Sequence, residues 1–268
     1  MNELTEKLAL KLRIKVLKMV HHANASHVGS CFSMIDILSV LYGSIMKFDS
    51  RQPKMQNRDR FILSKGHAAA AVYALLGELG FIKSSDLDSY GVDGSLYMTH
   101  INHKIPGVEF STGALGHGLS FGVGKSLSCK LHGNIWRTFV ILSDGEMDEG
   151  SNWEALMFAA HHKLDNLIAI IDYNKLQSLA STEETLSLEP LVDKLIAFGC
   201  SVKEVDGHNH DELQKMLSSA PWAKGKPSVL VAHTVKGKGV TFMENKVEWH
   251  YKSPNKEQLL TALKELGD

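Results

Sequence analysis

The stretch TFVILSDGEMDEGSNWEALMFAAHHKLDNLIAIIDYNKLQ, residues 138–177, decides the fold. Two short apolar runs, residues 139–142 and 167–171, flank a helical segment, and Asp144 follows the first run while Asn174 follows the second. Short β-branched runs on either side of a helix are typical of a βαβ unit, whose two strands are parallel neighbours. A right-handed crossover then predicts that Asp144 and Asn174 lie side by side at the carboxyl edge of the sheet, where open α/β sheets bind ligands.

This edge has the chemistry of a site for a cation and a phosphate. One carboxylate, one amide and nearby backbone carbonyls are hard oxygen donors, which suit Mg²⁺ better than Zn²⁺. The helix that begins at Gly150-Ser151 adds unpaired N–H groups, which favour an anion. The lysines of the KGKG run at 236–239 could also face an anion, although the spacing is not that of a Walker loop. The residues predict a Mg²⁺–diphosphate site, and an ordinary βαβ unit with Asp and Asn in turns is the alternative.

The rest of the chain repeats the alternation of strands and helices. Three further strands are predicted, at residues 60–63, 201–205 and 228–232. Helices are predicted at residues 3–25, 33–46, 68–79, 119–132, 191–198, 209–217 and 255–266. No repeat, low-complexity tract or linker divides these elements. We therefore predict the α/β class, with a single domain over residues 1–268 and a mainly parallel sheet covered by helices on both faces.

Two of these helices have a capping signal at their start. The tetrapeptides 33–36 and 209–212 have the residue types and spacing of a capping box. The cap at Asn209 gives that residue a sufficient structural role, so its neighbours His208 and His210 are predicted to be loop residues.

Composition and charge narrow the class of protein. A net charge of −1 and a hydrophobic content of 44% describe an ordinary globular protein, with neither nucleic acid nor an anionic membrane favoured as a partner. No apolar run is expected to reach the length of a membrane span, and the N-terminus has no apolar signal segment. Cys31, Cys129 and Cys200 are isolated from one another, which indicates free thiols in a reducing cytoplasm. We expect a cytoplasmic location.

Histidines are numerous, and several of the 14 stand beside glycines rather than within apolar stripes. His67 follows the first predicted strand and so belongs at the same sheet edge. His27 lies in a loop of small residues, where a single backbone bond is the simplest role. His100 and His103 lie in residues 81–112, an aperiodic segment of the kind that often covers a site. No third and fourth ligand follow them at zinc spacing, so zinc is not favoured.

The central stretch resembles the thiamine-diphosphate signature, which begins Gly-Asp-Gly and ends in Asn after one βαβ unit. Its segments EGSNWEA and LDNLIAIIDYNKLQ are similar to the transketolase family in particular. HHANASHVGS, LSKGHA, STGALGHG and KGKGVTFMENKVEWH continue the match along the chain. The whole chain resembles the amino-terminal, diphosphate-binding part of a transketolase. Two positions depart from the family pattern, because Ser143 stands where Gly is usual and Thr99-His100-Ile101 stands where Gly-His-Pro is usual.

The resemblance implies a role for each matching residue. The implied ligands of Mg²⁺, or of Ca²⁺ or Mn²⁺, are Asp144, Asn174 and the carbonyl of Leu176. The implied contacts to thiamine diphosphate are Gly113, Leu115, Asp144, Gly145, Glu149, Asn174 and His67. The implied catalytic residues around the reacting carbon and the sugar hydroxyls are His27, His67, His100 and His250, with Glu149 coupling two active sites across a subunit contact.

The resemblance also implies that half of each active site is supplied elsewhere. Transketolases continue into a second α/β domain, which contributes a glutamate and an aromatic residue to the pyrimidine ring across a dimer interface. We therefore expect a separate C-terminal subunit, an α2β2 assembly, and transfer of a two-carbon ketol unit from a ketose or ketose phosphate to an aldose. Two alternatives stay open: a thiamine enzyme component that uses 2-oxo acids, such as an E1-like protein or a decarboxylase, and a non-catalytic cofactor-binding subunit.

Overall fold

A sheet of five parallel strands lies at the centre of the computed structural model, which describes residues 2–268. The strand order across the sheet is β1-β2-β3-β5-β4. The strands are β1 Arg60–Leu63, β2 Thr138–Ser143, β3 Leu167–Tyr173, β4 Ser201–Asp206 and β5 Ser228–His233. Each overlaps a strand predicted from the sequence, which confirms the α/β class and the parallel sheet.

The predicted βαβ unit forms as expected, because β2 and β3 are hydrogen-bonded parallel neighbours. Every residue of these two strands is buried, which explains their continuous apolar runs. Successive side chains point to opposite faces of the sheet: Phe139 and Ile141 enter one apolar core, and Val140 and Leu142 enter the other. The paired ends of the two strands bring Asp144 and Asn174 to one edge.

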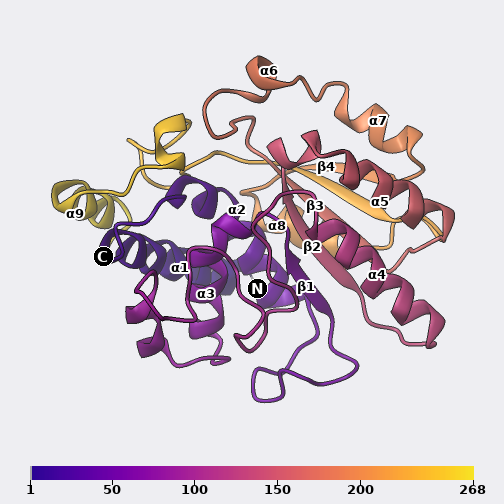
Figure 1. Cartoon of the computed structure of the whole chain (residues 1–268), viewed down its shortest axis with the longest axis horizontal. Coiled ribbons are helices and arrows are strands. Elements are labelled where there is room, and N and C mark those ends of the chain that lie inside the picture. The colour runs from indigo at the N-terminus through magenta and orange to yellow at the C-terminus, as the bar shows by residue number, and fades with distance from the viewer. Residues whose placement is uncertain (1) are drawn as a thin grey trace.

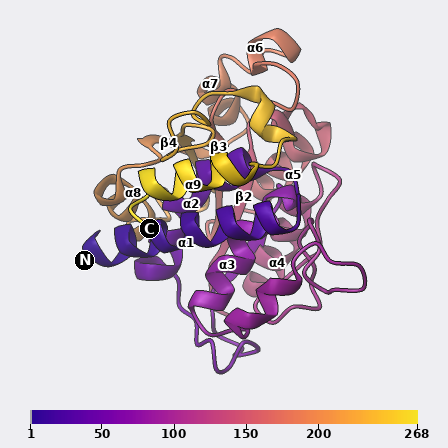
Figure 2. The same ribbon diagram turned by 90° about the vertical axis from the view of Figure 1, so that its left-hand side faces the viewer.

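Helices cover both faces of the sheet, as predicted (Figure 1). The first face carries α1 Asn2–His22, α2 Val28–Val40, α3 Ala69–Glu78, α8 His210–Ser218 and α9 Lys256–Glu265. The second face carries α4 Gly118–Leu131, α5 Gly150–His161 and α7 Leu191–Ala197. The short helix α6, Thr182–Thr185, lies in the connection after β3. Figure 2 shows α9 alongside α1, and Lys18 pairs with the last residue, Asp268, at 2.6 Å.

Helix α2 begins at Val28, earlier than predicted, so the capping box expected at residues 33–36 is wrong. Ser33 is fully buried inside the helix, where its hydroxyl donates to Asp172 at 2.5 Å. The residue before the helix is His27, whose φ of 76° places it in the left-handed region that few non-glycine residues adopt. The backbone N–H of His27 donates to the carbonyl of His250 at 2.8 Å, so a contact with a distant segment stabilises this turn.

Helix α2 continues into one π-helical turn, Leu41–Ile45, and the combined segment corrects a second expectation. Residues 28–45 form a helix that is long and apolar enough to cross a membrane by length and composition, although no apolar run of that length was expected. Within the fold 83% of this segment is buried. A helix that is hydrophobic on all sides is also typical of the core of a large domain, and this one packs between α1 and α3.

Helix α8 confirms one prediction and corrects another. The side chain of Asn209 accepts from the backbone N–H of Glu212 at 3.1 Å, so the predicted N-cap is present. The Glu212 carboxylate bonds to the side chain of Asn209, at 3.0 Å. His208 and His210 are not simple loop residues, because both bond to the buried carboxylate of Asp36, and His210 is the first residue of the helix.

Candidate active site

A pocket of about 250 Å³ opens at the carboxyl edge of the sheet. Parallel strands bring their following loops to the same edge, so distant segments of the chain meet there. Among the predicted site residues, its lining includes His27, His67, His100, Gly113, Leu115, Asp144, Gly145, Asn174, Leu176 and His250. The structure therefore brings together all of the predicted site residues except Glu149.

Asp144 and Asn174 occupy the centre of this edge, at the ends of β2 and β3. Asp144 is buried, and its carboxylate accepts from the backbone N–H of Gly145 at 2.8 Å and from that of Lys175 at 2.5 Å. The side-chain oxygen of Asn174 accepts from the backbone N–H of Leu176 at 3.1 Å. These bonds fix both side chains against the loop after β3, so the predicted juxtaposition is present.

A buried lysine reaches this edge from the turn after β5. The Lys236 ammonium donates to the carbonyl of Leu176 at 3.0 Å and to that of Gln177 at 2.8 Å, and it lies 3.0 Å from Nδ1 of His250. Of the two lysines in the KGKG run, Lys236 lines the pocket, whereas Lys238 lies outside its lining. The carbonyl of Leu176, predicted as a metal ligand, therefore already accepts from a cation.

Four imidazoles form a cluster in the pocket. The ring of His27 lies at its centre, with centroids 5.0 Å from His67, 5.1 Å from His250 and 6.0 Å from His100. The rings of His67 and His250 are 5.4 Å apart. Nδ1 of His27 is buried without a hydrogen-bond partner, which is uncommon for a ring nitrogen unless a ligand or water supplies one.

Burial and nearby cations keep these imidazoles neutral. Burial, followed by the charges of His100, Lys236 and Lys65, lowers the pKa of His27 to about 4. Burial and then Lys236 lower the pKa of His250 to about 3. The pKa values of the other two imidazoles are lowered as well, chiefly by burial. Neutral rings carry one donor and one acceptor each, which suits them to hydroxyl groups.

The carboxyl group of Asp144 has the opposite electrostatic problem. Burial, and then repulsion from Asp172, raise the pKa of Asp144 to about 7. A cation beside a carboxyl group favours its ionised form. The carboxylate is thus placed where a bound positive charge would be stabilised.

Close packing at Gly145 and Gly113 keeps backbone exposed in the pocket. A Cβ atom at Gly145 would lie 2.9 Å from Cγ of Gln177, so a side chain there would displace Gln177. A Cβ atom at Gly113 would lie 3.5 Å from the ring of His100. The backbone groups at these positions therefore face the pocket without a side chain to cover them.

Glu149 lies apart from the pocket. It is exposed and stands immediately before α5, where its side chain packs beside Gly116. A position on the surface is compatible with the predicted role at a subunit contact, which remains a prediction.

A buried ion pair beneath the pocket was not predicted from the sequence. The Lys65 ammonium lies 2.5 Å from the carboxylate of Asp172 and donates to the carbonyl of Ser30 at 3.0 Å. Asp172 also accepts from Ser33 and Thr234. Both members of the pair stand at the ends of apolar strands, within LSKGHA and IIDYN, and charged residues at such positions were the available signal.

Comparison with known proteins agrees with this geometry. The family pattern described as "Transketolase, thiamine diphosphate binding domain" matches residues 4–267. One of the two subunits of an apulose-4-phosphate transketolase, from Phocaeicola vulgatus, is 41% identical over 96% of this chain and 92% of its own length. A 6-deoxy-6-sulfo-D-fructose transketolase subunit from a Clostridium species is 39% identical over 95% of this chain and 93% of its own length.

Longer transketolases contain this fold as their first part. The structure of transketolase from Campylobacter jejuni superposes with a TM-score of 0.94 at 30% identity, over 99% of this chain and 43% of that one. Human transketolase is 35% identical over 96% of this chain, which spans only 41% of the human protein. The chain therefore belongs to the transketolase family and forms its thiamine diphosphate-binding domain.

Proposed function

We propose that this chain is the N-terminal subunit of a split transketolase, which transfers a two-carbon ketol unit from a ketose or ketose phosphate to an aldose. One observation carries this proposal: four neutral imidazoles and the Asp144–Asn174 edge line the same pocket. A sugar offers several hydroxyl groups to such rings, whereas a 2-oxo acid offers few. The sugar-transferring reaction is therefore favoured over a reaction of 2-oxo acids.

The residues present fit a divalent cation together with a diphosphate. Asp144, whose pKa is raised to about 7, needs a neighbouring positive charge to stay ionised, and the Leu176 carbonyl already accepts from the Lys236 ammonium. Mg²⁺ would be held by the Asp144 carboxylate, the Asn174 side-chain oxygen and the Leu176 carbonyl, and Ca²⁺ or Mn²⁺ would accept the same oxygen donors. The backbone N–H of Gly145 and the ammonium of Lys236 would bind diphosphate oxygens.

The histidines would bind the sugar and move its protons. When bound, thiamine diphosphate supplies a nucleophilic carbon and an electron sink. An ammonium can only donate, so Nδ1 of His250 accepts from Lys236 and the ring proton of His250 stays on Nε2. Nδ1 of His27 has no partner in the fold and is open to a substrate hydroxyl. Neutral rings of this kind bind hydroxyls and transfer protons near neutral pH.

A second polypeptide would complete the site. The two relatives above that match almost end to end are both called transketolase subunits, whereas the single-chain transketolases are more than twice as long as this chain. We infer that a separate C-terminal subunit provides the pyrimidine-binding half, in an α2β2 assembly in which Glu149 lies at a contact between two copies of this chain. The donor and acceptor sugars depend on residues of both subunits.

A tagged pull-down from the source organism tests this proposal. We expect one stoichiometric partner that resembles the pyrimidine-binding and C-terminal parts of transketolase. The purified complex should transfer a ketol unit between a ketose phosphate and an aldehyde and should leave pyruvate unchanged. Turnover of pyruvate without turnover of ketose phosphates would instead support an enzyme of 2-oxo acids. Recovery of the chain alone, still able to bind thiamine diphosphate, would contradict the two-subunit proposal.

A further inference from the structure

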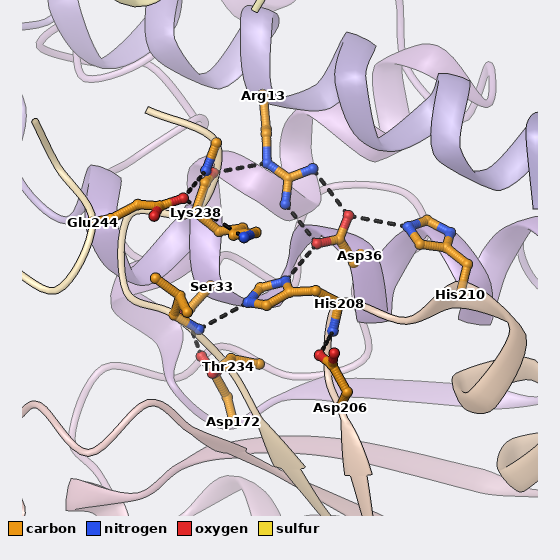
Figure 3. Close-up of polar contacts among 12 residues, drawn as sticks. Arg13, Ser33, Asp36, Asp172, Asp206, His208, His210, Thr234, Lys238 and Glu244 are labelled. Carbon is orange, nitrogen blue, oxygen red and sulfur yellow. Dashed lines mark hydrogen bonds and ion pairs between the residues drawn. The ribbon is translucent and has the colours of Figure 1, made fainter. Parts of the chain in front are cut away.

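The turn after β5, residues 234–239, carries Lys236 into the pocket, and a buried polar cluster lies behind it (Figure 3). We call this the Asp36 cluster; its members are Arg13, Asp36, His208 and His210. Two nitrogens of the Arg13 guanidinium lie 2.9 and 2.6 Å from the two carboxylate oxygens of Asp36. Nδ1 of His208 and Nε2 of His210 lie 2.7 and 3.1 Å from the same carboxylate. The cluster therefore joins α1, α2 and the segment that leads into α8.

The carboxylate at the centre of this cluster is ionised and only accepts hydrogen bonds. Asp36 is buried, which by itself raises its pKa, but bonds from His208 and His210 and the charge of Arg13 hold the pKa well below its ordinary value. Each ring nitrogen that faces Asp36 must therefore carry a proton. For His208, the proton is on Nδ1.

The other nitrogen of His208 contacts the turn. The backbone N–H of Val235 donates to Nε2 of His208 at 2.8 Å, so Nε2 carries no proton. The backbone N–H of His208 in turn donates to Asp206 at 2.9 Å, which holds the residue at the end of β4. His208 is thus a neutral imidazole in a single tautomer, and it connects Asp36 to the main chain one residue before Lys236.

Further bonds hold the turn on both sides of Lys236. Nε of Arg13 donates to the carbonyl of Lys238 at 3.0 Å, and the backbone N–H of Gly237 donates to the carbonyl of Gly29 at 3.1 Å. The hydroxyl of Thr234 donates to Asp172 beneath the pocket. A lysine side chain has many rotamers, so its ammonium reaches a defined place only if its backbone is held.

We propose that His208 is a positioning residue for the cofactor site: it lies outside the pocket lining and, by accepting from Val235 N–H, sets the backbone from which Lys236 reaches the Leu176 carbonyl and the diphosphate. This inference rests on the proposed function, because a role for Lys236 at a diphosphate presupposes that the cofactor binds here. Loss of the contact should move Lys236 while leaving the pocket side chains unchanged.

Two substitutions separate the two contacts of His208. In His208→Gln the side-chain oxygen reaches the place of Nε2 and can still accept from Val235. In His208→Asn the side-chain amide reaches the place of Nδ1 and can still donate to Asp36, but it leaves Val235 N–H unpaired. We expect His208→Asn to weaken the binding of magnesium thiamine diphosphate to the assembled enzyme by roughly five- to tenfold, the size of one net hydrogen bond. We expect His208→Gln to bind nearly as wild type.

A second readout does not depend on the cofactor. Hydrogen exchange of the Val235 amide, followed by NMR in the isolated chain, should be faster in His208→Asn and near the wild-type rate in His208→Gln. His210→Asn is the matched control, because it removes a bond to the same carboxylate without touching the turn, and it should leave both cofactor affinity and Val235 exchange unchanged. If wild type itself fails to bind the cofactor, the proposed function fails, and the exchange comparison still decides whether His208 holds the turn.

The opposite ranking would overturn the proposal. If His208 served only to neutralise Asp36, His208→Asn would be the milder change and His208→Gln the more damaging one. Equal effects of the two substitutions on Val235 exchange, or an equal loss of cofactor affinity in His210→Asn, would also contradict a specific role for the contact with Val235.

Discussion

The imidazole of His67 lies between those of His27 and His250, with ring centroids 5.0 and 5.4 Å away. Removing it should damage proton transfer more than cofactor binding, because the diphosphate edge lies on other residues. We expect His67→Ala to lower turnover of the assembled enzyme by roughly 10²-fold or more, with cofactor affinity nearly unchanged. Steady-state kinetics and a cofactor titration measure the two effects. His103→Ala, at a histidine that bonds Ser111 outside the pocket, is the control, and unaltered turnover in His67→Ala would remove the catalytic role.

The lowered pKa of His27 predicts a dependence of stability on pH. Folded His27 binds a proton only near pH 4, whereas the unfolded side chain binds one near pH 6.5. Between these values the unfolded chain holds more protons, so the free energy of unfolding falls as the pH drops from about 6.5 to about 4, and it is unaffected by this group above that window.

Substitution of His27 by Asn isolates this contribution, because Asn tolerates the left-handed backbone at φ 76°. We expect urea unfolding of His27→Asn to show a shallower loss of stability between pH 6.5 and pH 4 than wild type. Parallel pH profiles for the two proteins would contradict the assignment of that slope to His27.

Asp144 is the residue on which the metal assignment depends. We expect Asp144→Ala to weaken the magnesium-dependent binding of thiamine diphosphate by at least roughly tenfold, since metal affinity depends on each ligand and its surroundings. Calorimetry with and without Mg²⁺ would measure this, and the variant and wild type should converge when the metal is removed. Normal magnesium-dependent binding by the variant would exclude Asp144 as a ligand.

At the scale of the elements, α4 packs closely on the sheet through one of its glycines. A Cβ atom at Gly122 would lie 2.5 Å from a methyl group of Val140 in β2, whereas nothing lies within 4 Å of one at Gly124. We expect Gly122→Ala to lower the free energy of unfolding by about 1–3 kcal/mol through overpacking. Gly124→Ala should raise it by about 0.5–1 kcal/mol, because alanine favours the helix. Equal effects in urea denaturation would contradict the packing role of Gly122.

The elements were predictable where their signals are local. The apolar runs of β2 and β3, and the polar residues that end them, stand in one continuous stretch, so the edge with Asp144 and Asn174 follows from the sequence. The start of α2 was not predictable in this way. Its N-terminal turn depends on the bond from His27 N–H to the carbonyl of His250, and no capping residue announces it.

The Asp36 cluster was unpredictable for the same physical reason. Arg13, Asp36 and His208 are far apart in the chain, and only the packing of α1, α2 and the end of β4 brings them together. The local cap at Asn209 was correctly predicted, but it led to the wrong expectation that the adjacent histidines belong to a loop. Lys236 was noticed as a lysine that could face an anion, whereas its buried place at the Leu176 carbonyl required the structure.

At the scale of the whole molecule, the chain provides one side of an active site. Its pocket holds the diphosphate edge and the histidines, and it covers 43% of the length of the Campylobacter jejuni transketolase on which it superposes. Catalysis should therefore belong to an assembly, and we expect this chain alone to be inactive.

A titration of the purified partner polypeptide into a fixed concentration of this chain, with thiamine diphosphate and Mg²⁺ present, tests that claim most directly. The rate of ketol transfer from a ketose phosphate to an aldehyde is recorded at each ratio. We predict no turnover without the partner and a rise to a plateau at one partner per chain. Turnover by the chain alone, or no turnover at any ratio, would contradict a split active site.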